Sequence, residues 1–251
     1  MLSPPSEEAL FAKPLYTRVV GSRILVFDAV DSTSSRALNA GGDGTVVVAE
    51  HQTCGRGRHG RPWHSAPGLG LWFSVAFEGN AEGLEFAAPL AVRQGLRPFC
   101  PLTIKWPNDL LAGNRKLCGI LTEHRAGITV TGIGINMRHR EEDLPEGMRE
   151  SATSLFLATG QYVDRGEVLR RILTALDDRI CALREGKGEA IRREWAAACN
   201  VEGRRVRYRG LEGNVTAIDR QGGLMLDTPE GARRVLFGER IDWMEDEPCS
   251  S

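Results

Sequence analysis

The sequence predicts an α+β protein in which helices flank a mixed β-sheet and a small β-barrel follows. Three features predict this class. Strand-like apolar segments occupy much of residues 23–137, two helical segments follow up to about residue 199, and short strands separated by glycine-containing turns complete the chain. We therefore expect two domains, a large one over residues 1–199 and a small one over residues 200–251.

The composition is that of an ordinary globular protein. The 251 residues are 41% hydrophobic, and 32 Lys and Arg against 33 Asp and Glu give a net charge of −1, which argues against a general polyanion-binding protein. The N-terminal residues lack the features of a signal peptide, and no apolar run approaches the length of a membrane span. Six cysteines without C-x-x-C pairs indicate reduced thiols rather than a zinc site or disulfides. These observations predict a cytoplasmic protein without a membrane partner.

The first elements alternate between strands and a short helix. Residues 23–30 and 45–52 are rich in β-branched and apolar residues and predict strands, and residues 70–77 predict a third. Between the first two strands, the cluster Asp31-Ser32-Thr33-Ser34 is suited to cap a helix that runs to about Asn39. The segment between the second and third strands is therefore a loop held at both ends by strands.

The following segment completes the predicted sheet. Apolar residues at helical spacing predict a helix over residues 84–94. Residues 102–106 predict a strand that Pro107 interrupts. Residues 116–123 and 128–137 predict the two strands of a hairpin.

Two helices and a set of short strands come next. Apolar residues three and four positions apart predict an amphipathic helix over residues 167–183 that covers the core, and a second helix over about residues 189–199 places Trp195 in the core. Further strands are predicted at residues 204–209, 215–219, 223–227, 232–237 and 240–244. The alternating arginines of residues 204–209 favour a strand with one solvent-exposed face over an RNA-binding surface, because no aromatic stacking platform accompanies them.

The most informative segment is the loop Gly55-Arg56-Gly57-Arg58-His59-Gly60-Arg61-Pro62-Trp63-His64. Its glycines match the G-x-G-x-x-G spacing of a dinucleotide-binding turn, but that turn requires a helix that begins inside the loop, and Pro62, Pro67 and Gly68 oppose one. No acidic residue occurs from His51 to Phe77. Backbone amides and guanidinium groups in such a loop can enclose a phosphate or a carboxylate. A solvated basic loop and a nucleic-acid contact are the alternatives.

Three further segments place polar groups at strand ends: Lys105-Trp106-Pro107-Asn108-Asp109, residues 116–121 (KLCGIL) and residues 132–137 (GIGINM). Lys105 and Asp109 are costly to bury unless they form an ion pair with each other or contact a ligand. Lys116 could be an ordinary surface lysine. Gly119 three residues later would let a ligand approach the backbone closely.

In this order, the segments GRGRHGRPW, KWPND, KLCGIL and GIGINM resemble the catalytic core of biotin protein ligases. The resemblance is strongest over about residues 24–136, and the later helices and strands resemble that family's remaining helices and SH3-like C-terminal domain. It implies a class II synthetase-like core that activates biotin with ATP as biotinyl-5′-AMP, with Mg²⁺. Transfer to a lysine of a biotin carboxyl carrier protein domain would follow. Because the chain begins close to the first core strand, we expect neither the DNA-binding domain of the repressor members nor a DNA partner.

The resemblance also implies individual roles. The catalytic residues would be Lys116, Arg58 and Asp109, with Asp109 also a candidate Mg²⁺ ligand and a candidate base in the transfer step. The biotin site would comprise Ser32, Thr33, Ser34, Gln52, Gly55, Arg56, Gly57, Arg58, Trp63, Lys116 and Gly119, with Ser34 replacing the usual asparagine. ATP and the adenylate would contact Arg56, Arg58, Arg61, Lys105, Asn108, Lys116 and Asn136. Cys54 and Cys118 lie beside these motifs, and we expect both to serve packing.

Three alternatives remain at this point. A lipoate or octanoate ligase would share the fold and the chemistry, but its usual Arg-Arg and triple-glycine motif is not found in this sequence. A nucleic-acid-binding module using the arginine loop is a candidate of another class, and it would show steep salt dependence without a need for ATP. A family member that binds biotin without catalysis is disfavoured by the presence of Lys116 and the loop arginines. The sequence is compatible with a monomer or a homodimer.

Overall fold

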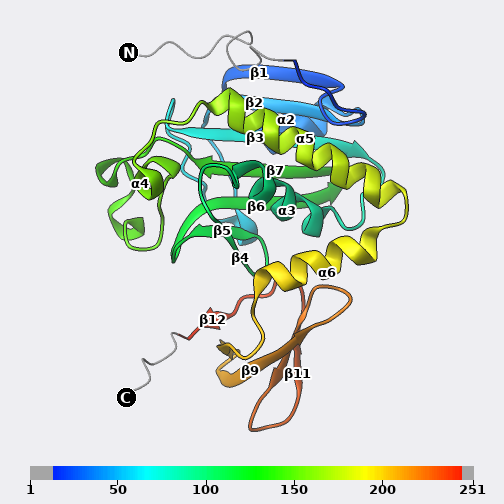
Figure 1. Ribbon diagram of the computed structural model, residues 1–251, viewed down its shortest axis with the longest axis vertical. Coiled ribbons are helices and arrows are strands. Elements are labelled where there is room, and N and C mark those ends of the chain that lie inside the picture. The colour runs from blue at the N-terminus through cyan, green and yellow to red at the C-terminus, as the bar shows by residue number, and fades with distance from the viewer. Residues whose placement is uncertain (1–13, 245–251) are drawn as a thin grey trace.

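The structure, a computed structural model, describes residues 14–244, and its centre is a seven-stranded mixed sheet (Figure 1). The strand order is β1-β2-β3-β7-β6-β5-β4. β1 and β2 run parallel, and every other neighbouring pair is antiparallel. The strands are β1 (Arg23–Val30), β2 (Thr45–Gln52), β3 (Gly70–Glu78), β4 (Thr103–Lys105), β5 (Asp109–Ala112), β6 (Arg115–Arg125) and β7 (Ile128–Asn136). The predicted mixed sheet is confirmed, although β5 was not expected.

Helices cover the two faces of this sheet unequally. On one face lies α2 (Thr33–Ala40), which begins at the predicted cap because the Ser32 hydroxyl accepts a hydrogen bond from the Ser35 backbone N–H. On the other face lie α3 (Leu84–Leu96) and the long α5 (Arg165–Arg184), seen crossing the sheet in Figure 1. The remaining helical elements are α4 (Leu155–Thr159), α6 (Gly188–Cys199) and the 3₁₀ turns η1 (Arg58–Gly60), η2 (Glu141–Asp143) and η3 (Glu146–Met148).

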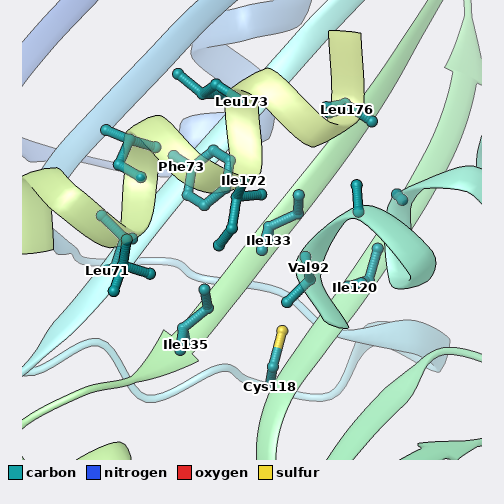
Figure 2. Close-up of a cluster of buried hydrophobic side chains, with 14 of the residues drawn as sticks. Leu71, Phe73, Val92, Cys118, Ile120, Ile133, Ile135, Ile172, Leu173 and Leu176 are labelled. Atoms are coloured by element: carbon teal, nitrogen blue, oxygen red, sulfur yellow. The ribbon is translucent and has the colours of Figure 1, made fainter. Parts of the chain in front are cut away.

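The main hydrophobic core lies between the sheet and the α3–α5 layer. Leu71 and Phe73 of β3 face Ile172 and Leu173 of α5, and all four are buried (Figure 2). The three- and four-residue spacing of apolar side chains on α5 forms this contact, as the sequence predicts. The opposite face of the sheet carries the short helix α2, the arginine loop and His139, whose ring packs against Trp72.

A five-stranded antiparallel sheet follows α6, in the order β11-β10-β9-β8-β12. Its strands are β8 (Arg205–Tyr208), β9 (Leu211–Ile218), β10 (Leu224–Asp227), β11 (Arg233–Val235) and β12 (Asp242–Trp243). In β8, Val206 is buried while Arg205 and Arg207 are exposed and both pair with Glu212, which confirms the strand with one solvent-exposed face. No helix within residues 14–244 is long and apolar enough to cross a membrane.

A second hydrophobic cluster joins the small sheet to the large one. Trp195 of α6 is fully buried, as predicted, and packs against Phe86 of α3 with ring centroids 4.8 Å apart. Residues of β8, β9, β10 and β11 belong to the same cluster, and so does Trp106 from the end of β4. The two sheets therefore share a continuous apolar contact rather than a flexible junction.

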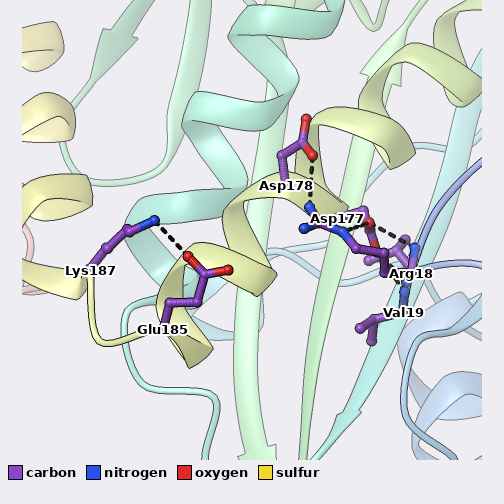
Figure 3. Close-up of polar contacts among 7 residues, drawn as sticks. Arg18, Val19, Asp177, Asp178, Glu185 and Lys187 are labelled. Atoms are coloured by element: carbon purple, nitrogen blue, oxygen red, sulfur yellow. Dashed lines mark hydrogen bonds and ion pairs between the residues drawn. The ribbon is translucent and has the colours of Figure 1, made fainter.

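Polar contacts fasten α5 to the N-terminal segment. The buried Asp177 carboxylate accepts hydrogen bonds from the backbone N–H groups of Arg18, Val19 and Val20 (Figure 3). Burial acts to raise the pKa of Asp177, but these hydrogen bonds outweigh it and the pKa is lowered. The turn between α5 and α6 carries an exposed ion pair, in which Lys187 Nζ lies 2.6 Å from a Glu185 carboxylate oxygen (Figure 3).

A buried ion pair connects the N-terminus of α5 to both strands that carry the arginine loop. Arg165 donates to the two carboxylate oxygens of Glu50 on β2, at 3.0 and 2.8 Å, and to the backbone carbonyl of Gly70 on β3, at 3.1 Å. The side chains of Arg165 and Glu50 are only 9% and 11% exposed. One guanidinium thus fixes the spacing of the strand ends between which the loop is suspended.

We expect the substitution Arg165→Ala to lower the free energy of unfolding by about 3–5 kcal/mol, because it leaves the Glu50 carboxylate buried without its partner. Chemical denaturation measures this loss. Arg193→Ala is the matched control, since Arg193 is 72% exposed in its pair with Glu189 and its removal should change stability little. Equal losses in the two variants would contradict the bracing role of Arg165.

Candidate functional site

The arginine loop folds as a compact flap between β2 and β3. The Trp63 backbone N–H donates to the Gly55 carbonyl at 2.8 Å, and the Gly57 N–H donates to the Arg61 carbonyl at 2.8 Å. A single 3₁₀ turn over Arg58–Gly60 forms its tip. No α-helix begins in the loop, so the sequence argument against a dinucleotide-binding turn is confirmed. The Gly57 N–H group, expected to contact ligand, is engaged within the flap.

The flap lies on a strip of the sheet that lacks side chains. Gly134 of β7 and Gly119 of β6 are direct cross-strand neighbours, and Trp72 and Asp109 lie opposite them on the next strands. Residues in such a row point to one face of a sheet. A Cβ atom at Gly134 would lie 2.6 Å from the Trp63 ring, and one at Gly119 would lie 2.7 Å from it. The two glycines therefore form a flat seat for the Trp63 indole.

A β-bulge brings Lys116 to this same face. Cys118 pairs with Leu110, but Lys116 pairs with the adjacent Leu111, so β6 contains one extra residue, Leu117. Without the bulge, Lys116 would point with Cys118 into the core, because side chains two positions apart share a face. With it, the Lys116 side chain lies over Gly119, where a Cβ would approach Lys116 Cε to 3.1 Å.

Lys116 forms an ion pair with Asp109, with Nζ 2.7 Å from Oδ1. Its ammonium group also lies 5.2 Å from the centroid of the Trp63 ring, within cation–π range. Both charged side chains are partly exposed, 33% for Lys116 and 25% for Asp109. Lys105 is the cross-strand neighbour of Asp109, but Asp109 forms its ion pair with Lys116. The alternative of a Lys105–Asp109 ion pair is therefore wrong.

Gln52 organises the other end of the site. Its side-chain oxygen accepts hydrogen bonds from the backbone N–H of Thr33 at 2.9 Å and from the Thr33 hydroxyl at 3.0 Å. Its amide donates to the Ser65 hydroxyl at 3.0 Å. Ser74 of β3 lies 2.8 Å from the Thr33 hydroxyl and 3.1 Å from the Ser34 hydroxyl. The structure thus joins three predicted residues into one polar network.

Ser65 and Ser74 were not predicted, and both are buried within that network. Ser74 carried a signal, since it is the one polar side chain in the apolar run of residues 71–77. No sequence pattern identified Ser65, because it follows the loop whereas its hydrogen-bond partner Gln52 precedes it. A Cβ atom at Gly132 would lie 2.5 Å from the Ser34 hydroxyl, so a third glycine clears space beneath the network.

The loop arginines diverge from one another. Arg56 donates to the Ser35 hydroxyl at 3.0 Å, and a cavity of about 290 Å³ beside α2 is lined by Arg56 and Ser34 among other residues. Arg58 points toward the β4–β5 turn and donates to Asn108 Oδ1 at 3.2 Å. Burial lowers the pKa of Arg58, and the nearby Asp109 charge opposes that shift. Arg61 is exposed.

The segment 151–153 links Lys116 to Asn136, and it too was not predicted. The Lys116 backbone N–H donates to the Ser151 carbonyl at 2.8 Å, and the Thr153 N–H donates to the Lys116 carbonyl at 2.9 Å. The buried Asn136 side chain donates to the Thr153 carbonyl at 2.9 Å. Asn136 thereby keeps its amide oxygen as an acceptor for a ligand donor.

The two cysteines near the motifs differ. Cys118 is fully buried in the main core, on the face opposite the flap, and the packing expectation is confirmed (Figure 2). Burial raises the pKa of its thiol, which keeps the sulfur protonated and unreactive. Cys54 is exposed, so the packing expectation is wrong for that residue, because it lies outside the sheet at the start of the loop.

His139 is buried beneath the site. It packs edge-on against Trp72, with ring centroids 6.1 Å apart, and Trp72 packs in the same way against Trp63 at 6.2 Å. His139 is 1% exposed, and its Nδ1 finds no hydrogen-bond partner among residues 14–244. Burial lowers the pKa of His139 from 6.5 to about 4, so the ring is neutral at physiological pH.

Comparisons with known proteins decide the family. The model of the biotin/lipoate A/B protein ligase family matches residues 26–139. A biotin--[acetyl-CoA-carboxylase] ligase from Mycobacterium tuberculosis is 34% identical, with 94% of each chain covered. This chain belongs to the biotin/lipoate A/B protein ligase family. The bifunctional ligase/repressor BirA of Bacillus spizizenii is also 34% identical, over 90% of this chain and 75% of the relative.

A solved structure of the same family supports the fold. A biotin protein ligase from Aquifex aeolicus in complex with biotin and ATP matches with a TM-score of 0.78 and 30% identity, over 90% of this chain and all of that one. The expected ligase core with a following SH3-like sheet is therefore confirmed. All the site residues predicted from the sequence, Ser32 to Asn136, lie within the range that the ligase family model matches.

The buried histidine of this ligase gives a pH prediction. Between pH 6.5 and about 4 the unfolded chain binds a proton at His139 that the folded chain does not, so stability falls as the pH falls through this window. The loss attributable to His139 reaches about 3 kcal/mol. We expect His139→Phe to lessen the acid sensitivity, measured by urea denaturation at pH 7 and pH 4.5. His59→Asn, at an exposed loop position, is the control, and identical pH profiles for His139→Phe and wild type would contradict the prediction.

Proposed function

We propose that this chain joins biotin to a lysine of a biotin carboxyl carrier protein domain in two ATP-dependent steps. The observation that carries the proposal is the Lys116–Asp109 ion pair, which lies on a glycine-lined strip of the sheet directly beneath an arginine-rich flap. Family membership and the relatives that are named biotin ligases support it. The alternatives of a nucleic-acid module and of a non-catalytic biotin binder have no comparable support.

In the first step, a biotin carboxylate oxygen bonds to the α-phosphorus of ATP, and the bond from that phosphorus to pyrophosphate breaks. Two anions must approach each other, and negative charge grows on the phosphoryl oxygens in the transition state. Lys116 is placed to neutralise this charge if its ammonium group turns from Asp109 toward the α-phosphate. Arg58, already partly desolvated, would act more strongly than a solvated arginine because fewer waters compete for its donors.

Substrate contacts follow from the positions of the predicted residues. Ser34 and Arg56, which line the 290 Å³ cavity, would contact biotin, as would the Thr33–Gln52 network. Trp63 and Gly119 would form the wall and floor between biotin and nucleotide. Asn136, Asn108, Lys105 and Arg61 would face the nucleotide, with the free amide oxygen of Asn136 suited to accept a hydrogen bond from an adenine amino group.

Asp109 fits a magnesium ion that the nucleotide itself carries, whereas the Asn108 side-chain oxygen already accepts a hydrogen bond from Arg58. Among the described residues no group of three or more His, Cys, Asp and Glu side chains could hold a metal ion alone. Magnesium in nucleotide sites is commonly bound by one or two carboxylates together with substrate phosphates, and Asp109 can supply one. When bound, the ion would offset phosphate charge during attack and departure.

In the second step, the acceptor lysine amine bonds to the biotin acyl carbon and AMP leaves. The amine must lose a proton, and Asp109 is the candidate acceptor. Its carboxylate is paired with Lys116 here, so this role requires that Lys116 remain with the phosphate during transfer. We place the reaction in the cytoplasm, where ATP and carrier domains occur together and where the five free cysteines of residues 14–244 stay reduced.

The direct test uses labelled biotin, Mg-ATP and a purified carrier domain, with lipoate as the competing substrate. Incorporation of label into the carrier lysine that depends on ATP supports biotin ligation. Preferential incorporation of lipoate would instead favour the other branch of the family, and incorporation of neither would refute the proposal.

Replacing Lys116 by alanine is expected to slow adenylate formation roughly 10²-fold or more, because the transition state loses a preorganised positive charge. Pyrophosphate release under single-turnover conditions measures this step. Lys187→Ala removes an exposed lysine with a similar ion pair and serves as the control. Wild-type turnover by the Lys116 variant would remove Lys116 from the mechanism.

Replacing Arg58 by glycine is expected to increase release of biotinyl-5′-AMP into solution, because the flap loses its contact with Asn108. Labelling of lysines on an added bystander protein reports the released intermediate. Arg61→Gly is the matched control within the same loop, and it should raise the KM for ATP without comparable release. If bystander labelling stays at the wild-type level, Arg58 does not help to retain biotinyl-5′-AMP beneath the flap.

A further inference from the structure

The tip of the arginine flap touches the small C-terminal sheet. Arg58 Cζ lies 5.9 Å from the centroid of the Phe237 ring, in the turn that follows β11. At the next residue, a Cβ atom on Gly238 would lie 2.2 Å from Arg58 Nη2. The guanidinium therefore lies between Asn108 in the β4–β5 turn and the Phe237–Gly238 turn of the small sheet.

Phe237 is held in place by the large domain. Its ring centroid lies 5.7 Å from that of Phe86, 5.8 Å from that of Trp195 and 6.2 Å from that of Trp106. Trp106 in turn donates a hydrogen bond from Nε1 to the Gly222 carbonyl, at 2.8 Å. Aromatic rings packed edge to face from three elements leave the Phe237 ring little freedom, so the surface that it offers to Arg58 is fixed.

The backbone of the turn is fixed by its own polar contacts. The Glu239 N–H donates to the Leu236 carbonyl at 3.0 Å, and the Glu239 carboxylate accepts from the Leu236 N–H at 2.9 Å. The Tyr208 hydroxyl of β8 donates to the same carboxylate at 2.8 Å. The turn is thus a rigid support rather than a flexible end of the chain.

The contact between Arg58 and the Phe237–Gly238 turn offsets part of the cost of burying the guanidinium. A half-buried guanidinium has lost part of its hydration, and this lowers the pKa of Arg58. The Phe237 ring face and the Asn108 oxygen replace some of the lost water contacts. The site accommodates the guanidinium only because position 238 has no side chain, and the φ of +97° at Gly238 also favours glycine.

We propose that the Phe237–Gly238 turn of the small sheet positions Arg58 over the acyl-adenylate. The inference rests on the proposed ligase function and extends it, because Arg58 would be oriented by two domains rather than by its loop alone. Phe237 and Gly238 are positioning residues that act through Arg58.

Gly238→Ala is the informative substitution, because replacing Phe237 would also damage the aromatic cluster. Gly231→Ala is its matched control in the same sheet. The two glycines have nearly the same φ, +97° and +98°, so alanine strains the backbone equally at both. A Cβ at Gly231 meets nothing within 4 Å, whereas one at Gly238 would collide with Arg58.

The first readout is release of biotinyl-5′-AMP, measured by bystander labelling with wild type as reference. We expect Gly238→Ala to raise release roughly tenfold or more, as small displacements of a positioned group can do, and Gly231→Ala to leave it unchanged. Thermal unfolding should show similar midpoints for both variants. Equal release by the two glycine variants would overturn the inference. A wild-type protein that forms no adenylate would instead refute the proposed function.

The second readout is a double-mutant cycle with Arg58→Ala. If Gly238 acts through Arg58, Gly238→Ala should change release less than twofold when the guanidinium is already absent. A full effect of Gly238→Ala in the Arg58→Ala background would show that the turn acts on the fold or on another group, and the positioning role would be wrong.

Discussion

The site depends on two missing side chains. Gly119 and Gly134 face each other across β6 and β7, and any Cβ at either position would enter the volume of the Trp63 ring. A sheet surface bearing ordinary side chains at these positions would hold the Trp63 ring, and the flap with it, farther from the sheet. The glycines weaken the two strands, because glycine loses more backbone entropy than other residues on folding. The long pairing of β3 with β7 and of β7 with β6 stabilises the strands around them.

The bulge at Leu117 solves a second geometric problem. Side chains along a strand alternate between its two faces, and Cys118 lies on the face that packs into the α3–α5 core. A lysine two positions earlier would have been buried in the same core without a partner, at a large cost in lost hydration. One extra residue turns Lys116 to the opposite face, where it finds Asp109 and the Trp63 ring. The same strand therefore places Cys118 in the core on one face and Lys116 beneath the flap on the other.

The sequence predicted local features well and long-range contacts poorly. The limits of β1 and β2, the cap at Ser32 and the hairpin of β6 and β7 follow from short-range patterns, and all are found. The four-residue strand β5 was missed because Pro107 and Asn108 resemble a loop. The Arg165–Glu50 pair could not be predicted. Its two residues are separated by 115 positions, and the sequence around each one contains no pattern that identifies its partner. Pairings of this kind are fixed by the fold.

The position of the flap depends on contacts at its base, its centre and its tip. The flap is anchored at its base by strands that Arg165 holds together, at its centre by Trp63 on the glycine seat, and at its tip by Arg58 between two sheets. To open, it must expose the Trp63 ring and separate Arg58 from both Asn108 and Phe237. The free energy of opening therefore includes a contribution from the small sheet, even though that sheet supplies none of the residues assigned to the chemistry. An enzyme that must shield a hydrolysable acyl-adenylate and still release its product benefits from a flap held by several weak contacts, because each can be broken without unfolding the sheet.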